Sequence, residues 1–209
     1  MRTMYDSITA ANIPTDAAMV AGYLDGLYKW SASDWARFPN AVKVGIAVFT
    51  TTNNGMVLDV EHGNGDCSPK NVIKVPKWIT QRRNAGCDPS VYCSKDTQPA
   101  VIAACQAAGV ALPHWWIAWY SAPDHSKPLP DTEALQYAAD GSYDLSVVTD
   151  YWPGVDNGQT WPASHITQSL AQVESATAAA ATAPNLTTAW AQLRAAQAAI
   201  TAAMAALGS

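Results

Sequence analysis

"VKVGIAVF", residues 42–49, is apolar at almost every position, with Lys43 as its one charged residue. A strand with one face in water alternates apolar and polar side chains, whereas a parallel strand covered on both faces is apolar throughout. Other short runs are rich in β-branched or aromatic residues and are bounded by Gly, Pro, Asn or Asp. They are "MYDS" (4–7), "GYLDGLY" (22–28), "GMVLDVE" (55–61), "SVYCS" (90–94), "HWWIAWYS" (114–121), "EALQYA" (133–138) and "YDLSVV" (143–148). We therefore expect about eight strands in all.

Helical segments separate some of these runs. "SASDWARF" (31–38) begins with a Ser N-cap, and "TQPAVIAACQAAG" (97–109) runs from a Thr cap to a terminal Gly. The β/α alternation fits either a closed barrel or an open doubly wound sheet. A (β/α)8 barrel typically needs about 250 residues, more than residues 1–150 supply. The predicted fold is thus α/β, an abbreviated or irregular (β/α)8 TIM-type barrel whose second half has missing or vestigial helices.

Composition changes after this predicted barrel, which we place at residues 1–150. Residues 151–162 form a turn-rich linker, and residues 163–209 are Ala-rich and predict a helical hairpin broken at Pro184. The second helix carries one apolar stripe, which must pack on something. Three interpretations stay open for residues 163–207: packing within this chain, self-association, or docking to a larger assembly.

Charge and hydropathy exclude some classes of partner. The net charge of −5 and the pI near 5.2 argue against nucleic acid, because phosphate binding needs clustered Lys and Arg. The local basic cluster, residues 70–83, reads as a solvated helix face. No apolar run approaches the roughly 20 residues of a membrane-spanning helix, so no membrane insertion is expected. The start lacks a secretory signal, which suggests a protein made in the cytoplasm that reaches its place of action after release.

Cofactor and metal motifs are not recognisable either. The sequence has no G-x-S-x-G, P-loop or dinucleotide fingerprint, and its histidines lack metal-ligand spacing. The four cysteines fit no zinc pattern. Free thiols are the default interpretation, with a Cys67–Cys87 or a Cys93–Cys105 bridge as the alternative. No metal and no cofactor is predicted.

Carboxylates gather at the predicted strand ends. Asp59 and Glu61 are two positions apart in one strand, so they share a face. At the carboxyl end of a buried parallel strand they would lie where barrel enzymes place their sites, although for the pair taken alone a strand that ends in a solvated loop is the more frequent explanation. Asp6 and Asp144 belong to the first and last strands, which are neighbours in a closed barrel. Aromatic and polar residues of the intervening strands would line the same mouth: Tyr92, Trp116, Tyr120 and Gln136.

A mouth that combines carboxylates with aromatic rings is typical of carbohydrate binding and glycoside hydrolysis. The order of the motifs also resembles glycoside hydrolase family 25, the muramidases, whose strands carry D-x-S, D-x-E, a Tyr-containing strand, W-I-A-x-Y, W-Q-Y and V-D-x-N. It is more similar still to the shortened glycoside-hydrolase-like barrels of actinobacteria and their phages. The resemblance covers roughly residues 4–150, through "YDS", "VLDVE", "VYCS", "HWWIAWYS", "LQY" and "YDLSVV".

This resemblance implies hydrolysis of a β-1,4 bond of cell-wall peptidoglycan, with Glu61 as the general acid. Asp59, Asp6 and Asp144 would shape and charge the site, and Asp59 would orient the acetamido group of the substrate in a substrate-assisted mechanism. The implied substrate-binding residues, which would contact the glycan or hold a carboxylate, are Tyr92, Trp116, Tyr120 and Gln136.

The sequence also departs from the family pattern. Asp25 stands in a second strand that lacks the usual longer pattern, so its assignment to substrate binding is the loosest. Leu135 replaces the Trp of W-Q-Y, and Ser146 stands where Asn is usual. Two rival functions therefore remain: a non-catalytic barrel that binds cell-wall glycan or serves as a phage structural component, and a barrel with unrelated hydrolase chemistry.

Overall fold

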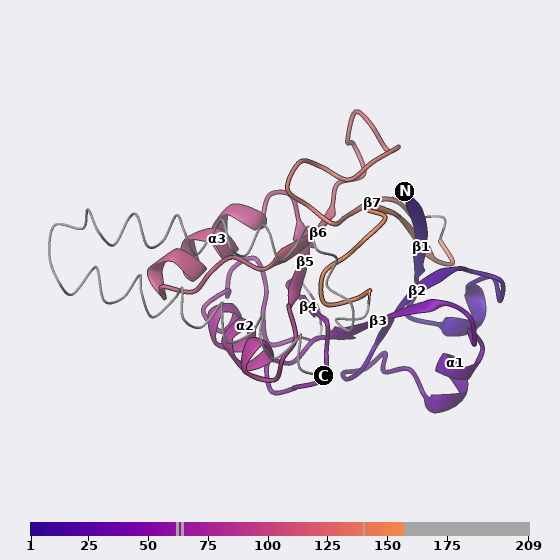
Figure 1. Cartoon of the computed structure of the whole chain (residues 1–209), viewed down its shortest axis with the longest axis horizontal. Helices are drawn as coiled ribbons and strands as arrows, with labels where there is room; N and C mark the ends of the chain where they lie inside the picture. Colours follow the sequence, from indigo (N-terminus) through magenta and orange to yellow (C-terminus); the bar gives the residue numbers. More distant parts are fainter. Residues whose placement is uncertain (62, 64, 140, 157–209) are drawn as a thin grey trace, which may run out of the picture. The chain divides into compact units, whose positions relative to one another are not determined.

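The computed structural model describes residues 1–61, 63, 65–139 and 141–156. In this part of the chain the strands follow one another around a closed barrel in sequence order (Figure 1). Residues 157–162 of the predicted linker and the predicted helical hairpin lie outside the described residues. The strands are β1 (Arg2–Asp6), β2 (Met19–Tyr23), β3 (Val42–Ala47), β4 (Val57–Asp59), β5 (Ser90–Ser94), β6 (His114–Ala118), β7 (Ala134–Ala139) and β8 (Asp144–Val148). The predicted closed barrel is confirmed.

The last strand reverses the direction of the barrel. Strands β1 to β7 pair in parallel, whereas β8 is antiparallel to both β7 and β1. Residues 140–143 are too short a link for a parallel crossover, which needs a dozen residues or more. Gly141, whose φ of 88° suits glycine, lies in this link. As a consequence the beginning of β8 lies at the carboxyl end of the other strands, where Asp144 faces Asp6.

Helices cover only part of the barrel, as the short chain predicted. Figure 1 shows α2 and α3 on one side and α1 on the other. The described residues between β6 and β8 contain no helix. Ser31 is confirmed as an N-cap, because its hydroxyl accepts from the Asp34 N–H; Thr97 holds the N-cap position of its helix without a side-chain cap bond. The helices are η1 (Ala10–Asn12), α1 (Ala32–Ala36), α2 (Val75–Asn84) and α3 (Gln98–Ala107).

The strand predicted at residues 22–28 is placed too late in the sequence. Strand β2 ends at Tyr23, and the chain turns at Gly26, whose φ of 73° is unfavourable for other residues. The Asp25 side chain holds this turn to the next loop by accepting from the backbone N–H groups of Val48 and Phe49. The hydrophobic pattern of residues 22–28 thus reflects a strand end followed by a buttressed loop.

Alternation along the strands produces two apolar layers. Inward side chains such as Met4, Ile46 and Val57 fill the barrel, and Trp152, from the segment after β8, belongs to this inner cluster. Outward side chains such as Leu58 pack beneath α2 and α3 together with Trp78 and other helix residues. Burial on both faces explains why the strands read as continuous apolar runs.

Three smaller predictions can be compared with the structure. All four cysteines are free thiols, in agreement with the default interpretation. No helix in the described residues is long and apolar enough to cross a membrane. The basic cluster is only partly a solvated face, because the Arg82 side chain is buried and its Nε donates to the Gly55 carbonyl at 2.7 Å.

Candidate active site

The pair Asp59 and Glu61 stands at the carboxyl end of β4. Its alternate neighbours, Leu58 and Val60, are fully buried in the outer apolar layer, and Val57 packs inside the barrel. This alternation turns the two carboxyl side chains toward the mouth of the barrel. The sequence-based expectation that they share a face is therefore met, because the outward positions are occupied by residues that require burial.

One carboxyl oxygen of Asp59 has no hydrogen-bond partner in the part of the chain that the structure describes. Its Oδ1 is buried and makes no hydrogen bond among the described residues, while the carboxyl group accepts from the backbone N–H of Glu61. Burial, and after it the charge of Glu61, raises the pKa of Asp59 to about 8. At neutral pH the site therefore carries a proton on a buried acid, with an oxygen atom that is unsatisfied in the absence of a ligand.

Gln136 connects the side chains on the other side of the mouth through hydrogen bonds of its amide group. Its Oε1 accepts from the hydroxyls of Tyr92 at 2.7 Å and Tyr120 at 2.8 Å. Its Nε2 donates to both oxygens of Asp6, at 3.1 and 3.0 Å, and to Asp144 at 3.3 Å. The side chain is only 1% exposed, so its amide can hardly turn without losing several bonds. Four strands are thus linked through one amide group.

Asp6 and Asp144 face one another across β1 and β8. Burial and then the charge of Asp144 raise the pKa of Asp6 well above its usual value, and the bond from Gln136 opposes this shift. Glu61 and Asp59 raise it further. The four predicted carboxyl groups therefore lie within electrostatic reach of one another, at one end of the barrel.

The aromatic residues divide into a floor and a rim. Trp116 is 1% exposed, donates from its indole N–H to Ser146 Oγ at 3.0 Å, and packs against Tyr92 with ring centroids 4.5 Å apart. It supports the mouth from below, so direct contact with a ligand is not available to it. Tyr120 is half exposed and stands at the rim. The predicted common strand face is not observed, because β6 ends at Ala118 and Tyr120 lies in the following turn, although its hydroxyl still reaches Gln136.

Asp25 and Tyr23 lie at or just after the end of β2. The Asp25 carboxylate is engaged by the loop after β3, through Val48, Phe49 and the Thr52 hydroxyl; its assignment to substrate binding stays a prediction. Tyr23, at the end of β2, was missed: burial and then the charge of Asp59 raise the pKa of its hydroxyl. Alternation from Met19 would have placed it inside the barrel, had the strand been correctly positioned.

The described residues contain no group of three or more His, Cys, Asp or Glu side chains arranged to hold a metal ion. The converging carboxyl groups include Asp59, an acid whose raised pKa keeps a proton in the mouth. Such an arrangement can donate a proton to a ligand oxygen and stabilise positive charge that develops nearby.

No family model matches the sequence, and no curated protein matches it. Two solved structures are similar in fold. A family 25 glycosyl hydrolase from Bacillus anthracis has a TM-score of 0.50 at 13% identity, covering 72% of this chain and 90% of its own. The chain has the family 25 barrel fold. The bacterial lysozyme from Streptomyces coelicolor gives a TM-score of 0.47 at 14% identity, covering 71% of this chain and 92% of its own. At 13% identity, the likeness to the Bacillus anthracis enzyme shows the fold alone.

Proposed function

We propose that this protein is a glycoside hydrolase that cuts a β-1,4 bond in the glycan chains of cell-wall peptidoglycan. The observation that carries the proposal is the meeting of Asp6, Asp59, Glu61 and Asp144 at the mouth of a family 25-type barrel. A proton is retained there at neutral pH, as acid-catalysed glycosidic cleavage requires. The two structures of similar fold, a lysozyme and a family 25 glycosyl hydrolase, support the same reaction class.

In this proposal Glu61 is the proton donor. In the free chain Asp59 holds a proton, and its buried Oδ1 has no hydrogen-bond partner among the described residues. An acetamido N–H of the substrate that donates to Oδ1 would favour the carboxylate form of Asp59. The proton that Asp59 carries in the free chain would then pass to Glu61. Glu61 then protonates the leaving oxygen as its bond to the anomeric carbon breaks, while the acetamido oxygen attacks that carbon and the Asp59 carboxylate stabilises the positive charge. Water then attacks the same carbon and displaces the acetamido oxygen, and the proton that the water loses returns to Glu61.

The remaining residues would position the substrate and the acids. Gln136 fixes Asp6 and Asp144 at their separation and orients the Tyr120 ring, which offers its exposed face to a sugar. Tyr92 and Trp116 keep Gln136 in place from below. The substrate would be met at the cell wall, after release of the protein from the cell that makes it or by carriage in a phage particle.

The test is digestion of purified actinobacterial cell walls, followed by the release of reducing ends. Glu61→Gln is expected to abolish release while leaving the fold and melting temperature unchanged, because Gln keeps the shape of the side chain but cannot donate the proton. Asp124→Asn, which alters an exposed carboxylate in the loop after β6, serves as the matched control and should keep full activity. Activity of the wild type should fall as pH rises through about 8. Above that pH the free chain loses the proton that Asp59 holds, and no proton is left to pass to Glu61.

Full activity of the Glu61→Gln variant would contradict the proposal. A wild-type protein that sediments with cell walls but leaves their glycan chains uncut would identify the same mouth as a binding site without catalysis.

A further inference from the structure

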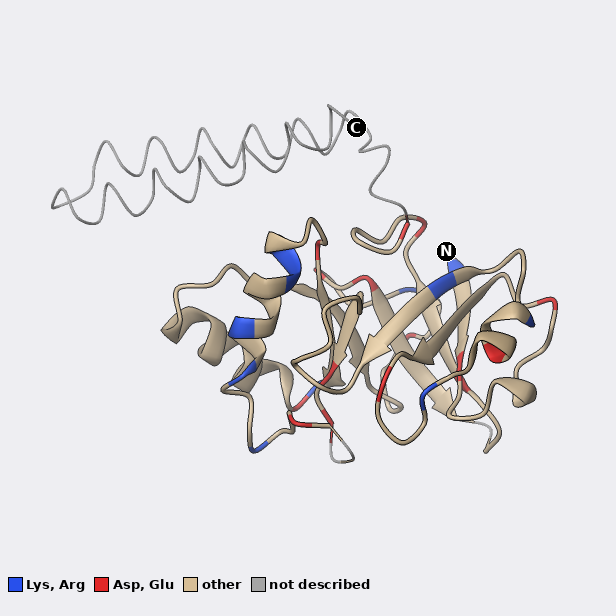
Figure 2. Ribbon diagram, turned by 90° about the horizontal axis from the view of Figure 1, so that it is seen from below, with Lys and Arg blue, Asp and Glu red and all other residues tan. Residues whose placement is uncertain are grey.

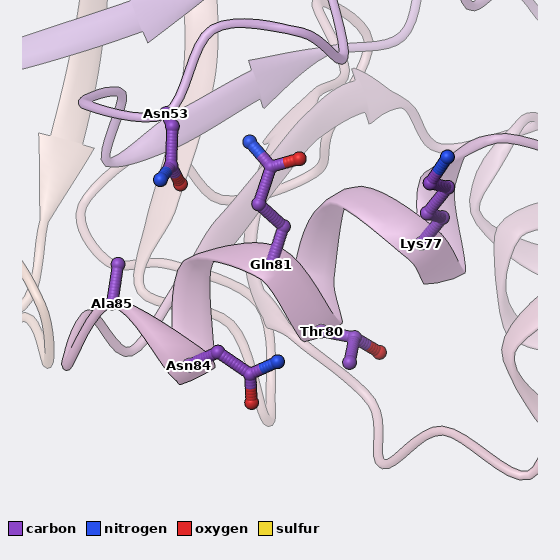
Figure 3. A pocket seen from close by; sticks show the side chains of 6 residues that line it. All are labelled: Asn53, Lys77, Thr80, Gln81, Asn84 and Ala85. Atoms are coloured by element: carbon purple, nitrogen blue, oxygen red, sulfur yellow. The ribbon is translucent and has the colours of Figure 1, made fainter.

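A second candidate site lies outside the barrel, on the solvent side of α2. An open groove with a volume of about 550 Å³ runs between this helix and the loop that joins β3 to β4 (Figure 3). Trp78 and Ile79, on the opposite face of α2, pack into the outer apolar layer, so the groove and the core use different faces of one helix. The groove is lined by Asn53, Lys77, Thr80, Gln81, Asn84 and Ala85.

The groove offers hydrogen-bond donors without a carboxylate among its lining residues. The Asn53 amide oxygen accepts from Arg82 at 3.0 Å, which orients the side chain and leaves its NH2 group to donate. The exposed Lys77 ammonium and the Gln81 and Asn84 amides make no side-chain hydrogen bond with the described residues. Figure 3 shows the Asn53 and Gln81 amides reaching into the space between loop and helix.

A buried positive charge lies behind this groove. Arg82 is 7% exposed, and its guanidinium donates to oxygen atoms of Gly55 and Asn53 and also hydrogen-bonds the Cys87 thiol. No described carboxylate pairs with it, although a buried guanidinium normally has such a partner. The positive charge is therefore uncompensated and adds to the potential of the groove.

The surrounding surface has the same sign. Among the described cations near α2, Lys74 is paired with Asp66, at 3.1 Å, whereas Lys77 has no carboxylate partner. Arg83 donates to the carbonyl groups of Ala111 and Leu112. Figure 2 shows several blue segments on the side of the barrel that carries the long helices, and others elsewhere on the barrel. A chain with a net charge of −5 thus presents an acidic mouth and a separate polar groove in which Lys77 is the one charged lining residue.

We propose that the α2 groove binds the phosphate groups of a phosphorylated saccharide. Lys77 and the field of Arg82 would attract the phosphate, while the amides of Asn53, Gln81 and Asn84 would bond sugar hydroxyls. Nucleic acid fits less well, because the groove has no aromatic ring on which a base could stack. The inference does not depend on the proposed hydrolase activity, since the groove and the mouth share no residue.

The experiment is calorimetric titration of the full chain with phosphorylated dextran, in low and high salt. Dextran lacks the bond assigned to the mouth, so the result is independent of catalysis. Wild-type protein should bind phosphorylated dextran in low salt and should not bind unmodified dextran. Lys77→Glu should weaken binding at least about tenfold, because it reverses a charge beside the phosphate. The variant should keep its melting temperature, since Lys77 is exposed on a helix.

Lys127→Glu makes the same change of charge on an exposed lysine in the loop after β6 and should leave binding unchanged. Gln81→Ala should weaken binding a few-fold without changing the net charge. Four outcomes would overturn the inference: no binding by the wild type, an equal loss in Lys127→Glu, inorganic phosphate binding as tightly as phosphorylated dextran, or single-stranded DNA displacing the dextran at equal affinity.

Discussion

The two ends of the barrel use the same kinds of residue for opposite purposes. At the carboxyl end, Asp6 is buried and Asp59 is partly buried with its Oδ1 fully so, their partners carry no positive charge, and desolvation raises the pKa of each. At the amino end, Asp156 forms a bidentate pair with Arg2, at 2.5 and 2.6 Å. Acids that lack cations destabilise the fold but keep their protons, whereas paired acids stabilise it and are chemically inert.

The amino end is also closed by an apolar side chain. Trp152 is fully buried, donates to Ser90 Oγ at 2.8 Å and packs edge-on against Trp116, at 6.1 Å between ring centroids. Nearby, His114 bonds Asp88 at 2.8 Å and Glu133 at 3.1 Å. The closed amino end therefore supplies stability that offsets the unfavourable desolvation of the acids in the mouth. Measurements of stability can test this difference between the two ends.

The largest expected effect comes from opening the closed end. Trp152→Ala removes a large side chain from the inner core and should lower the free energy of unfolding by about 3–5 kcal/mol. Leu27→Ala, at an exposed apolar side chain in the loop after β2, should change it by less than about 0.5 kcal/mol. Urea unfolding curves of the two variants and the wild type provide the measurement. Similar losses in both variants would remove the proposed asymmetry between the ends.

A mutation in the mouth should raise the free energy of unfolding at high pH rather than lower it. Asp59 has a raised pKa in the folded state, so between about pH 4 and about pH 8 the folded chain binds more protons than the unfolded chain. Stability therefore falls as pH rises through this window, and Asp59→Asn should flatten the slope. At pH 9 the variant should be more stable than the wild type, by roughly 2 kcal/mol or more. An unchanged pH slope in unfolding experiments would show that Asp59 is not a buried proton carrier.

Local pattern predicted part of this mouth correctly. Asp59 and Glu61 could be assigned to one face because Leu58, which precedes the pair, and Val60, which separates its two members, must be buried on the other face. The shared mouth of Asp6 and Asp144 followed from barrel closure. The reversal of β8, which brings the start of that strand to the mouth, was not predicted, because it depends on the short link after β7 and on pairing with distant β1.

Other features required the three-dimensional arrangement. The bonds of Gln136 involve side chains from three other strands and one loop, and no sequence spacing encodes such a meeting. Trp152 belongs to a segment that was predicted as a linker from its turn residues, yet its side chain is buried because it packs into the inner cluster of the barrel. Similarly, Arg82 was assigned to a solvated face because burial of a charged side chain is uncommon.

His114 tests the amino end by pH. Burial alone would lower its pKa, but the bonds and charges of Asp88 and Glu133 outweigh burial and raise the pKa to about 9. Its stabilising contribution is complete below the unfolded pKa of about 6.5 and is lost as pH rises through about 9. His114→Gln should therefore cost about 2 kcal/mol at pH 6 and far less at pH 10. A cost that does not vary with pH would assign the effect to packing.

The smallest effect should come from the ion pair between Arg2 and Asp156. Arg2→Met removes two charge-assisted hydrogen bonds and a bond to the Thr149 carbonyl, in a partly buried setting, and should cost about 1 kcal/mol. Lys127→Met breaks an exposed pair with Asp124, at 3.7 Å, and should cost almost nothing. Because salt screens exposed charges more than buried ones, the cost at Arg2 should persist in high salt. Equal and salt-sensitive costs at both sites would mean that the amino end gains its stability from Trp152 and His114 rather than from its ion pairs.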